Sequence, residues 1–173
     1  MNYLSEYNEN ILDWTREMLS GGKVGHYLLA KYGEFHDIKT DRALFHYAMD
    51  IKRRYMRNAP LLDKVIYDSD IQLIKRALGM NTAISRIHGG KLKAKNEIRI
   101  AAVFRSLPQE FLRMIVVHEL AHLREKDHNK AFYGLCRNME PNYHQLEFDL
   151  RLYLTHLEIT GQQLWLAPDK QKT

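Results

Sequence analysis

The feature that most constrains the fold of this chain is the segment from Met114 to Leu123, where two histidines and a glutamate interrupt an apolar stretch. His118 and His122 stand four residues apart, so an α-helix places both imidazoles on one face, one turn apart. A helix this apolar belongs in a protein interior, where polar side chains without partners cost free energy. The pattern therefore predicts a buried helix whose histidines either share a ligand or hydrogen-bond within the core.

The residue types in this segment are those of a catalytic metal site. Neutral imidazole nitrogens bind zinc at about 2 Å, and catalytic zinc sites keep three protein ligands so that water takes the fourth position. Glu119, next to His118, can act as general base toward that metal-bound water while it attacks a polarised carbonyl or phosphoryl group. We predict a hydrolase that holds one divalent metal, Zn2+ by preference, although histidines also accept nickel, cobalt or iron.

The third metal ligand depends on a turn in the chain. His128 follows His122 by six residues, an offset that points away from the metal on a continuous helix, so residues 124–127 have to turn the chain back. The spacing equals that of the metzincins, but Glu125 occupies the position of their turn glycine, which excludes that group. The competing third ligands are Glu140, His144 and Glu147.

The composition excludes several classes of protein. With 173 residues, 45% of them hydrophobic, the chain can bury the core of one globular domain without disulfides. Cys136 is the single cysteine, so neither a disulfide framework nor a CxxC metal site can form within the chain. No apolar run reaches the roughly 18 residues of a membrane helix, and the first ten residues are not typical of a signal peptide. We expect a cytoplasmic protein without redox chemistry.

The net charge of +5 is unevenly distributed along the chain. Residues 41–113 carry fifteen Lys or Arg against seven Asp or Glu, whereas the segments before and after are slightly acidic. A basic block of this kind is either a solvated surface or the site of an anionic partner or substrate. Five of its residues surround a predicted hairpin and are candidates for substrate binding: Arg86, Lys91, Lys93, Lys95 and Arg99.

Three helices are predicted in the N-terminal part, residues 1–60. Apolar residues recur at steps of three and four from Leu4 to Met18, which predicts an amphipathic helix that stops at residues 20–22. A second helix is expected from Val24 to Tyr32. A third begins near Thr40 and is ended by Ala59 and Pro60.

A small antiparallel sheet is predicted in the catalytic core, residues 61–166. Residues 64–67 favour a short strand. From Ala83 onward the sequence favours two strands around a Gly-Gly turn, followed by a third strand in which side chains alternate from Glu97 to Phe104. The segment from Ile71 to Leu78 is compatible with helix or loop.

The C-terminal part is predicted to be helical. Ser106 and Gln109 form a capping-box pattern with Pro108 in the first turn, so the motif helix should begin there. Two further helices are expected at about 129–139 and 144–158.

These elements together predict an α+β, zincin-like single domain over residues 1–173. N-terminal helices and a small antiparallel sheet are expected to pack on the HExxH helix, with further helices after it. The polar tail, residues 167–173, is expected to fray.

Beyond the motif, the sequence resembles the YgjP-like family of bacterial metallopeptidase-type proteins, small zincins related in pattern to the SprT and WLM groups. The resemblance rests on HELAHLREKDHNKAF and MEPNYHQLEFDLRLYL, and extends to TDRALFHYAMDIKRRYMRNAP and SRIHGGKLKAKNEIRIA. It therefore covers nearly the whole chain. It implies a zinc ion held by three histidines, at positions that match His118, His122 and His128, with Glu119 as the base.

One segment departs from the broader relatives, which carry a tryptophan, glycine, serine and cysteine run where this chain has His88, Gly89, Gly90 and Lys91. In zincins an edge strand above the motif helix holds an extended peptide by strand addition, a role that residues 97–104 can fill. The cationic side chains around that strand suit phosphate groups at least as well.

Three functions stay open at this point. The first is hydrolysis of a peptide bond, and the second is hydrolysis of a nucleoside triphosphate, for example UTP to UMP and pyrophosphate, at the same ion. The third is a nucleic-acid-associated protein with a structural metal. In either enzyme, Tyr143 or His144 can stabilise the transition state from the far wall of the site. The substrate and the oligomeric state do not follow from the sequence.

Overall fold

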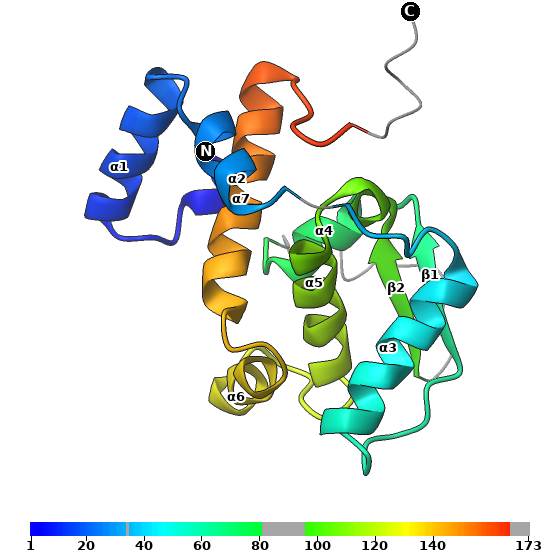
Figure 1. The fold of residues 1–173 in the computed structure, drawn as a ribbon. Helices are drawn as coiled ribbons and strands as arrows, with labels where there is room; N and C mark the ends of the chain where they lie inside the picture. The colour runs from blue at the N-terminus through cyan, green and yellow to red at the C-terminus, as the bar shows by residue number, and fades with distance from the viewer. Residues whose placement is uncertain (34, 81–95, 167–173) are drawn as a thin grey trace, which may run out of the picture.

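The computed structural model describes residues 1–33, 35–80 and 96–166. Within them the fold is mostly helical, with seven α-helices, short 3-10 helices (η) and a two-stranded sheet (Figure 1). The predicted α+β composition is thereby confirmed. In chain order the elements are η1 Asn2–Leu4, α1 Glu9–Ser20, α2 Val24–Lys31, α3 Asp41–Tyr55, β1 Lys64–Asp68, α4 Gln72–Ala77, β2 Glu97–Ala101, η3 Ala102–Ser106, α5 Gln109–Ala121, α6 Lys130–Met139 and α7 Tyr143–Thr160.

The two strands pair in parallel, from Lys64 opposite Glu97 to Asp68 opposite Ala101. The predicted antiparallel arrangement is therefore wrong. A parallel pair needs a long crossover connection, which the chain supplies between β1 and β2 through a segment that contains α4. β2 also ends before Phe104, because η3 replaces the predicted end of the strand. The two strands predicted between residues 83 and 95 lie outside the described residues.

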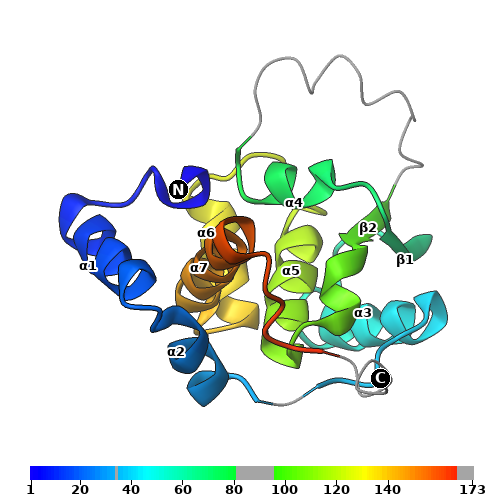
Figure 2. The ribbon, with the colours of Figure 1, turned by 90° about the horizontal axis from the view of Figure 1, so that it is seen from above.

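Helix α5, which carries the HExxH motif, lies in the middle of the molecule. It packs against β2 on one side and against α6 and α7 on the other, while α3 covers β1 (Figures 1 and 2). Nine of its thirteen residues are buried. This position explains why the sequence before and within the motif is apolar, and it confirms the predicted buried helix.

The N-terminal helices follow the predictions with one exception. Asn8 caps α1 by accepting the N–H of Ile11, so the helix begins at Glu9, and Leu4 belongs to the separate η1. The prediction of one helix from Leu4 is wrong because a side-chain cap interrupts the apolar periodicity. The expected second and third helices correspond to α2 and α3, and Thr40 caps α3 by accepting the N–H of Ala43.

The start of α5 differs in detail from the prediction. Ser106 is the last residue of η3, and Pro108 precedes the helix without a side-chain cap. The predicted capping box is therefore wrong, because Ser106 lies two residues before the N-cap position of a helix that begins at Gln109. The segment left open between helix and loop forms α4, and α6 and α7 confirm the two helices expected after the motif. The tail, residues 167–173, lies outside the described part.

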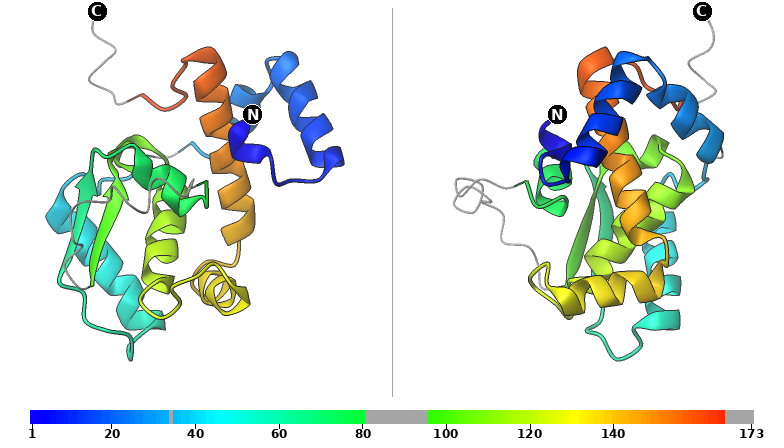
Figure 3. Two further views of the ribbon diagram at one scale, coloured as in Figure 1. Left: turned by 180° about the vertical axis from the view of Figure 1, so that it is seen from behind. Right: turned by 90° about the vertical axis from the view of Figure 1, so that its left-hand side faces the viewer.

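A buried carboxylate joins the N-terminal helices to α7, which stands between them and α5 (Figure 3). Asp149 on α7 accepts hydrogen bonds from the Tyr27 and Tyr32 hydroxyls and pairs with Lys31 at 2.8 Å. Its side chain is completely buried, so these donors replace the water that a carboxylate would otherwise bind.

Among the helices described, none has the length and apolarity needed to cross a membrane.

Candidate metal centre

Three histidines meet at the C-terminal end of α5. The Nε2 atom of His122 lies 3.2 Å from Nε2 of His118 and 3.1 Å from Nε2 of His128. Their candidate ligand atoms all lie within 4.8 Å of one another, and within the described residues no other group of three or more metal-binding side chains comes as close. The structure thus brings together the three predicted ligands, from a helix, its last turn and the following loop.

The turn that returns His128 to the cluster forms without glycine. Helix α5 ends at Ala121, and the N–H groups of Arg124 and Glu125 both donate to the carbonyl of that residue, which closes the last turn. No residue between His122 and Asn129 has a positive φ. Because no residue of this turn adopts the positive φ that favours glycine, Glu125 is accommodated where metzincins use glycine.

Hydrogen bonds orient two of the imidazoles. Nδ1 of His122 lies 2.8 Å from the carbonyl oxygen of Glu125. A carbonyl can only accept, so Nδ1 carries a proton and Nε2 is the nitrogen that faces the cluster, as a metal ligand requires. On the opposite side, Nδ1 of His118 lies 2.7 Å from the Tyr143 hydroxyl, which leaves its Nε2 directed to the same point.

The cluster fits a divalent ion in both geometry and protonation. Tetrahedral zinc with bonds of about 2.0–2.1 Å would hold its ligand nitrogens about 3.3 Å apart, close to the Nε2 separations found here. Burial, followed by the neighbouring His122 and His128, holds the pKa of His118 well below its usual value, and burial likewise lowers the pKa of His128. Both rings are therefore neutral near pH 7, the form that binds metal.

Phe132 forms an apolar wall behind the cluster. This buried residue of α6 lies between 4.6 and 4.9 Å from all three imidazole rings, measured between ring centroids. It limits the directions from which water can reach the nitrogens. Sequence reasoning did not assign it this position.

Tyr143 is fully buried at the start of α7, where its hydroxyl bonds the nitrogen of His118 that faces away from the cluster. This contact makes it a positioning residue for His118. Nothing in the sequence indicated the contact, because 25 residues separate the partners. The predicted role of Tyr143 in stabilising a transition state stays a prediction.

The other candidates from the sequence lie in different surroundings. His144 is exposed and lies 3.3 Å from the Arg137 guanidinium, and its ring is tilted against that of Tyr133 at 5.3 Å between centroids. The two alternative carboxylate ligands are ion-paired, Glu140 with Arg113 and Glu147 with Arg151. Glu119 is partly buried beside His118 on α5, and its role as a base stays a prediction.

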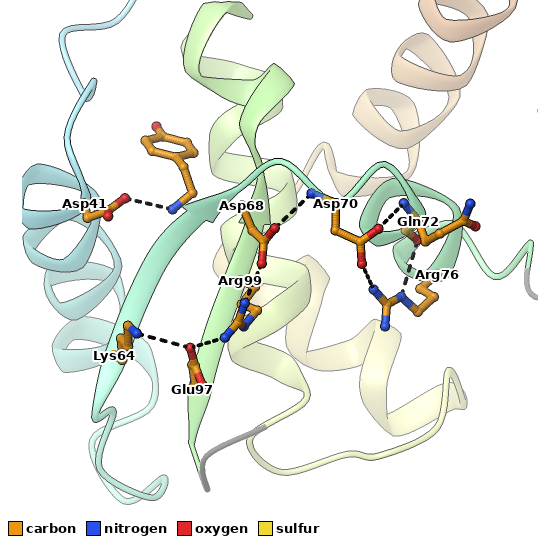
Figure 4. A network of polar contacts seen from close by, with 9 residues as sticks. Asp41, Lys64, Asp68, Asp70, Gln72, Arg76, Glu97 and Arg99 are labelled. Carbon is orange, nitrogen blue, oxygen red and sulfur yellow. Dashed lines mark hydrogen bonds and ion pairs between the residues drawn. The ribbon is translucent and has the colours of Figure 1, made fainter. Parts of the chain in front are cut away.

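Arg99 contacts two carboxylates of the sheet, one on each strand. It lies 2.5 Å from Asp68 on β1 and 3.1 Å from Glu97 on its own strand, and Glu97 is also 3.7 Å from Lys64 (Figure 4). These pairs compensate its charge and brace the parallel strands. Substrate binding by Arg99 stays a prediction, and the other four candidates, Arg86, Lys91, Lys93 and Lys95, lie outside the described residues.

Three imidazoles that converge on one point beside a helix glutamate are the arrangement of metal-dependent hydrolases. A family model described as YgjP-like, metallopeptidase domain, matches residues 67–153. The chain is also 55% identical over 159 residues to a protein of Escherichia coli (strain K12) named UTP pyrophosphatase. The matched residues make up 92% of this chain and 95% of that protein. The chain therefore belongs to the YgjP-like family, as its sequence predicted. No solved structure matches it.

Proposed function

We propose that this protein hydrolyses a nucleoside triphosphate, with UTP as the first candidate, to the nucleoside monophosphate and pyrophosphate in a metal-dependent reaction. The observation that carries the substrate is the relative named UTP pyrophosphatase, which is 55% identical over nearly the full length of both chains. The three-histidine cluster supports the metal. The relative and the histidine cluster together favour this activity over peptide-bond hydrolysis. Peptide-bond hydrolysis is supported by the word metallopeptidase in the family description.

In this proposal His118, His122 and His128 hold one divalent ion, zinc by preference, in a zincin-like domain of the cytoplasm. Such an ion supplies Lewis acidity to a phosphoryl oxygen and makes a water molecule more acidic. Glu119 takes the proton of the attacking water. The water oxygen bonds the α-phosphorus, the bond from that phosphorus to the bridging oxygen breaks, and the electron pair leaves with pyrophosphate.

The test is hydrolysis of UTP by metal-loaded protein, with UMP and pyrophosphate measured separately. Glu119→Gln keeps the size of the side chain but removes the base, so we expect turnover to fall roughly 10²- to 10⁴-fold while the metal content stays that of the wild type. Glu110→Gln is the matched control, because Glu110 is exposed in the first turn of the same helix. Full activity in Glu119→Gln would refute the proposed base.

Two further measurements separate this activity from its competitors. In oxygen-18 water, attack at the α-phosphorus places the label in UMP, whereas label in pyrophosphate would contradict the proposed bond cleavage. The peptidase alternative predicts fragments from an unstructured protein, again lost in Glu119→Gln. A nucleic-acid-binding protein with a structural metal predicts salt-dependent binding that Glu119→Gln leaves unchanged.

A further inference from the structure

An aromatic pocket lies between the N-terminal segment and α7. Its volume is about 530 Å3, within the range of small-molecule sites. Four aromatic residues contribute to its lining: Tyr7, Trp14, Tyr27 and Phe148.

The rings of this pocket are held in place by one another. Tyr7 meets Phe148 edge to face at 5.2 Å between centroids, and Trp14 meets Tyr27 in the same way at 5.5 Å. The Tyr27 hydroxyl is also tied to Asp149. Trp14 nevertheless remains 37% exposed, so a large part of its surface is available for stacking by a ligand.

Amide side chains stand at the rim of the pocket. Asn10, in the first turn of α1, is exposed and makes no side-chain hydrogen bond within the described part of the chain. Gln145 donates to Asp149 through Nε2, which leaves its oxygen as an acceptor. Aromatic faces that stack, with amide groups that meet an edge, are the means by which proteins bind single bases.

The pocket lies near the metal centre, and two aromatic rings span the distance between them. His144 belongs to the pocket lining, and its ring lies 5.3 Å from that of Tyr133, which in turn lies 6.3 Å from that of His128. No more than about 12 Å therefore separates the His128 and His144 rings. Arg137 bonds His144 at this point, where a guanidinium can contact a phosphate that lies between the two sites.

From this proximity we infer that the aromatic pocket binds the nucleobase of the substrate while the phosphates reach the three histidines. The inference rests on the proposed function for the identity of the substrate. It assigns base recognition to Trp14 and Asn10. It also gives the N-terminal segment, which lies away from the metal centre, a role in choosing the substrate.

Binding is tested first, without metal and without turnover. The chain has two tryptophans, and the other, Trp165, is 4% exposed, so uridine in the pocket should quench mainly Trp14. We expect saturable quenching by uridine that disappears in Trp14→Phe. Absence of quenching would overturn the inference, as would stronger quenching by N-acetyl-phenylalaninamide, which would indicate a site for peptide side chains.

Kinetics supply the second test. Trp14→Ala should raise the KM for UTP roughly tenfold or more and leave kcat nearly unchanged, whereas inhibition by tripolyphosphate, which has no base, should stay as in wild type. Asn10→Ala, which removes an exposed side chain without loss of packing, should raise KM in the same direction. Phe35→Ala is the matched control, because Phe35 is 44% exposed and lies outside the pocket.

The outcomes separate this inference from the proposed function. Uridine binding without UTP hydrolysis would refute the proposed function and leave the base pocket supported. UTP hydrolysis that depends on Glu119 but ignores Trp14→Ala and Asn10→Ala would overturn the pocket and retain the function. A rise in the inhibition constant of tripolyphosphate equal to the rise in KM would also overturn it, since the effect would then concern the phosphates.

Discussion

The hydrogen bond between Tyr143 and His118 provides a sharp test of the metal centre, since Tyr143→Phe removes only the hydroxyl. The bond is 2.7 Å long and both side chains are buried. Loss of such a support for a ligating histidine lowers metal affinity about 10- to 100-fold, or about 1.4–2.7 kcal/mol. In the metal-free protein the orphaned Nδ1–H should cost about 1–3 kcal/mol of folding stability.

Two assays measure these effects. Zinc affinity is determined by competition with a chromophoric chelator, and the free energy of unfolding is determined in urea with and without zinc. Tyr133→Phe is the matched control, because that ring lies 6.3 Å from His128 but makes no hydrogen bond to a histidine of the cluster. We expect weaker zinc binding and lower stability in Tyr143→Phe and values near wild type in Tyr133→Phe.

Wild-type zinc affinity in Tyr143→Phe would refute the reasoning. If that variant also lost kcat for UTP with unchanged KM, Tyr143 would act on the transition state instead, as the sequence suggested. A fall in both metal affinity and activity, with activity restored by excess zinc, identifies the hydroxyl as a positioning group for His118.

Further predictions concern metal removal, the buried carboxylate, a histidine outside the site and a helix cap. A chelator should abolish hydrolysis of UTP. His128→Ala should weaken zinc binding, while the metal-free variant keeps the circular dichroism spectrum of the wild type. Tight zinc binding in this variant would indicate another third ligand. Asp149→Ala should lower the free energy of unfolding by about 3 kcal/mol, since it leaves Lys31 and two tyrosines without their shared acceptor. The control is Asp50→Ala, which breaks an exposed pair with Arg53 and should cost under about 0.5 kcal/mol. Equal losses in the two variants would contradict the argument. Burial lowers the pKa of His36, whose Nδ1 accepts the N–H of Ile38 while Nε2–H donates to the Phe104 carbonyl. Because the pKa of His36 is lower in the folded than in the unfolded chain, its stabilisation is present above about pH 6.5 and is lost as the pH falls through the folded pKa. The free energies of unfolding of wild type and His36→Gln, measured in urea, should therefore converge toward acid pH, and a constant difference would refute this. Thr40→Ala should cost about 1 kcal/mol through loss of the α3 cap, and no change in the urea midpoint would show that the cap does not contribute.

The helices and the motif were predictable because their patterns involve residues close together in the sequence. Apolar residues at helical spacing predicted α3 with a start near Thr40, and the apolar surroundings of His118 and His122 predicted that α5 is buried. The sheet was not predictable in the same way. β1 and β2 are separated by α4 and a long connection, and pairing across such a distance in sequence leaves no local pattern, so the strands were predicted to be antiparallel.

For the metal centre, the sequence by itself determined which side chains were available. The spacing of His118 and His122 follows from the helical repeat, and Glu119 follows from its place between them. Only the tertiary structure decided how His128 joins them, because its position depends on a turn without positive φ. It also decided the orientation of the rings, since a backbone carbonyl and a tyrosine 25 residues away hold them. Sequence patterns report neighbours along the chain, whereas the Tyr143 contact arises when α5 and α7 pack together.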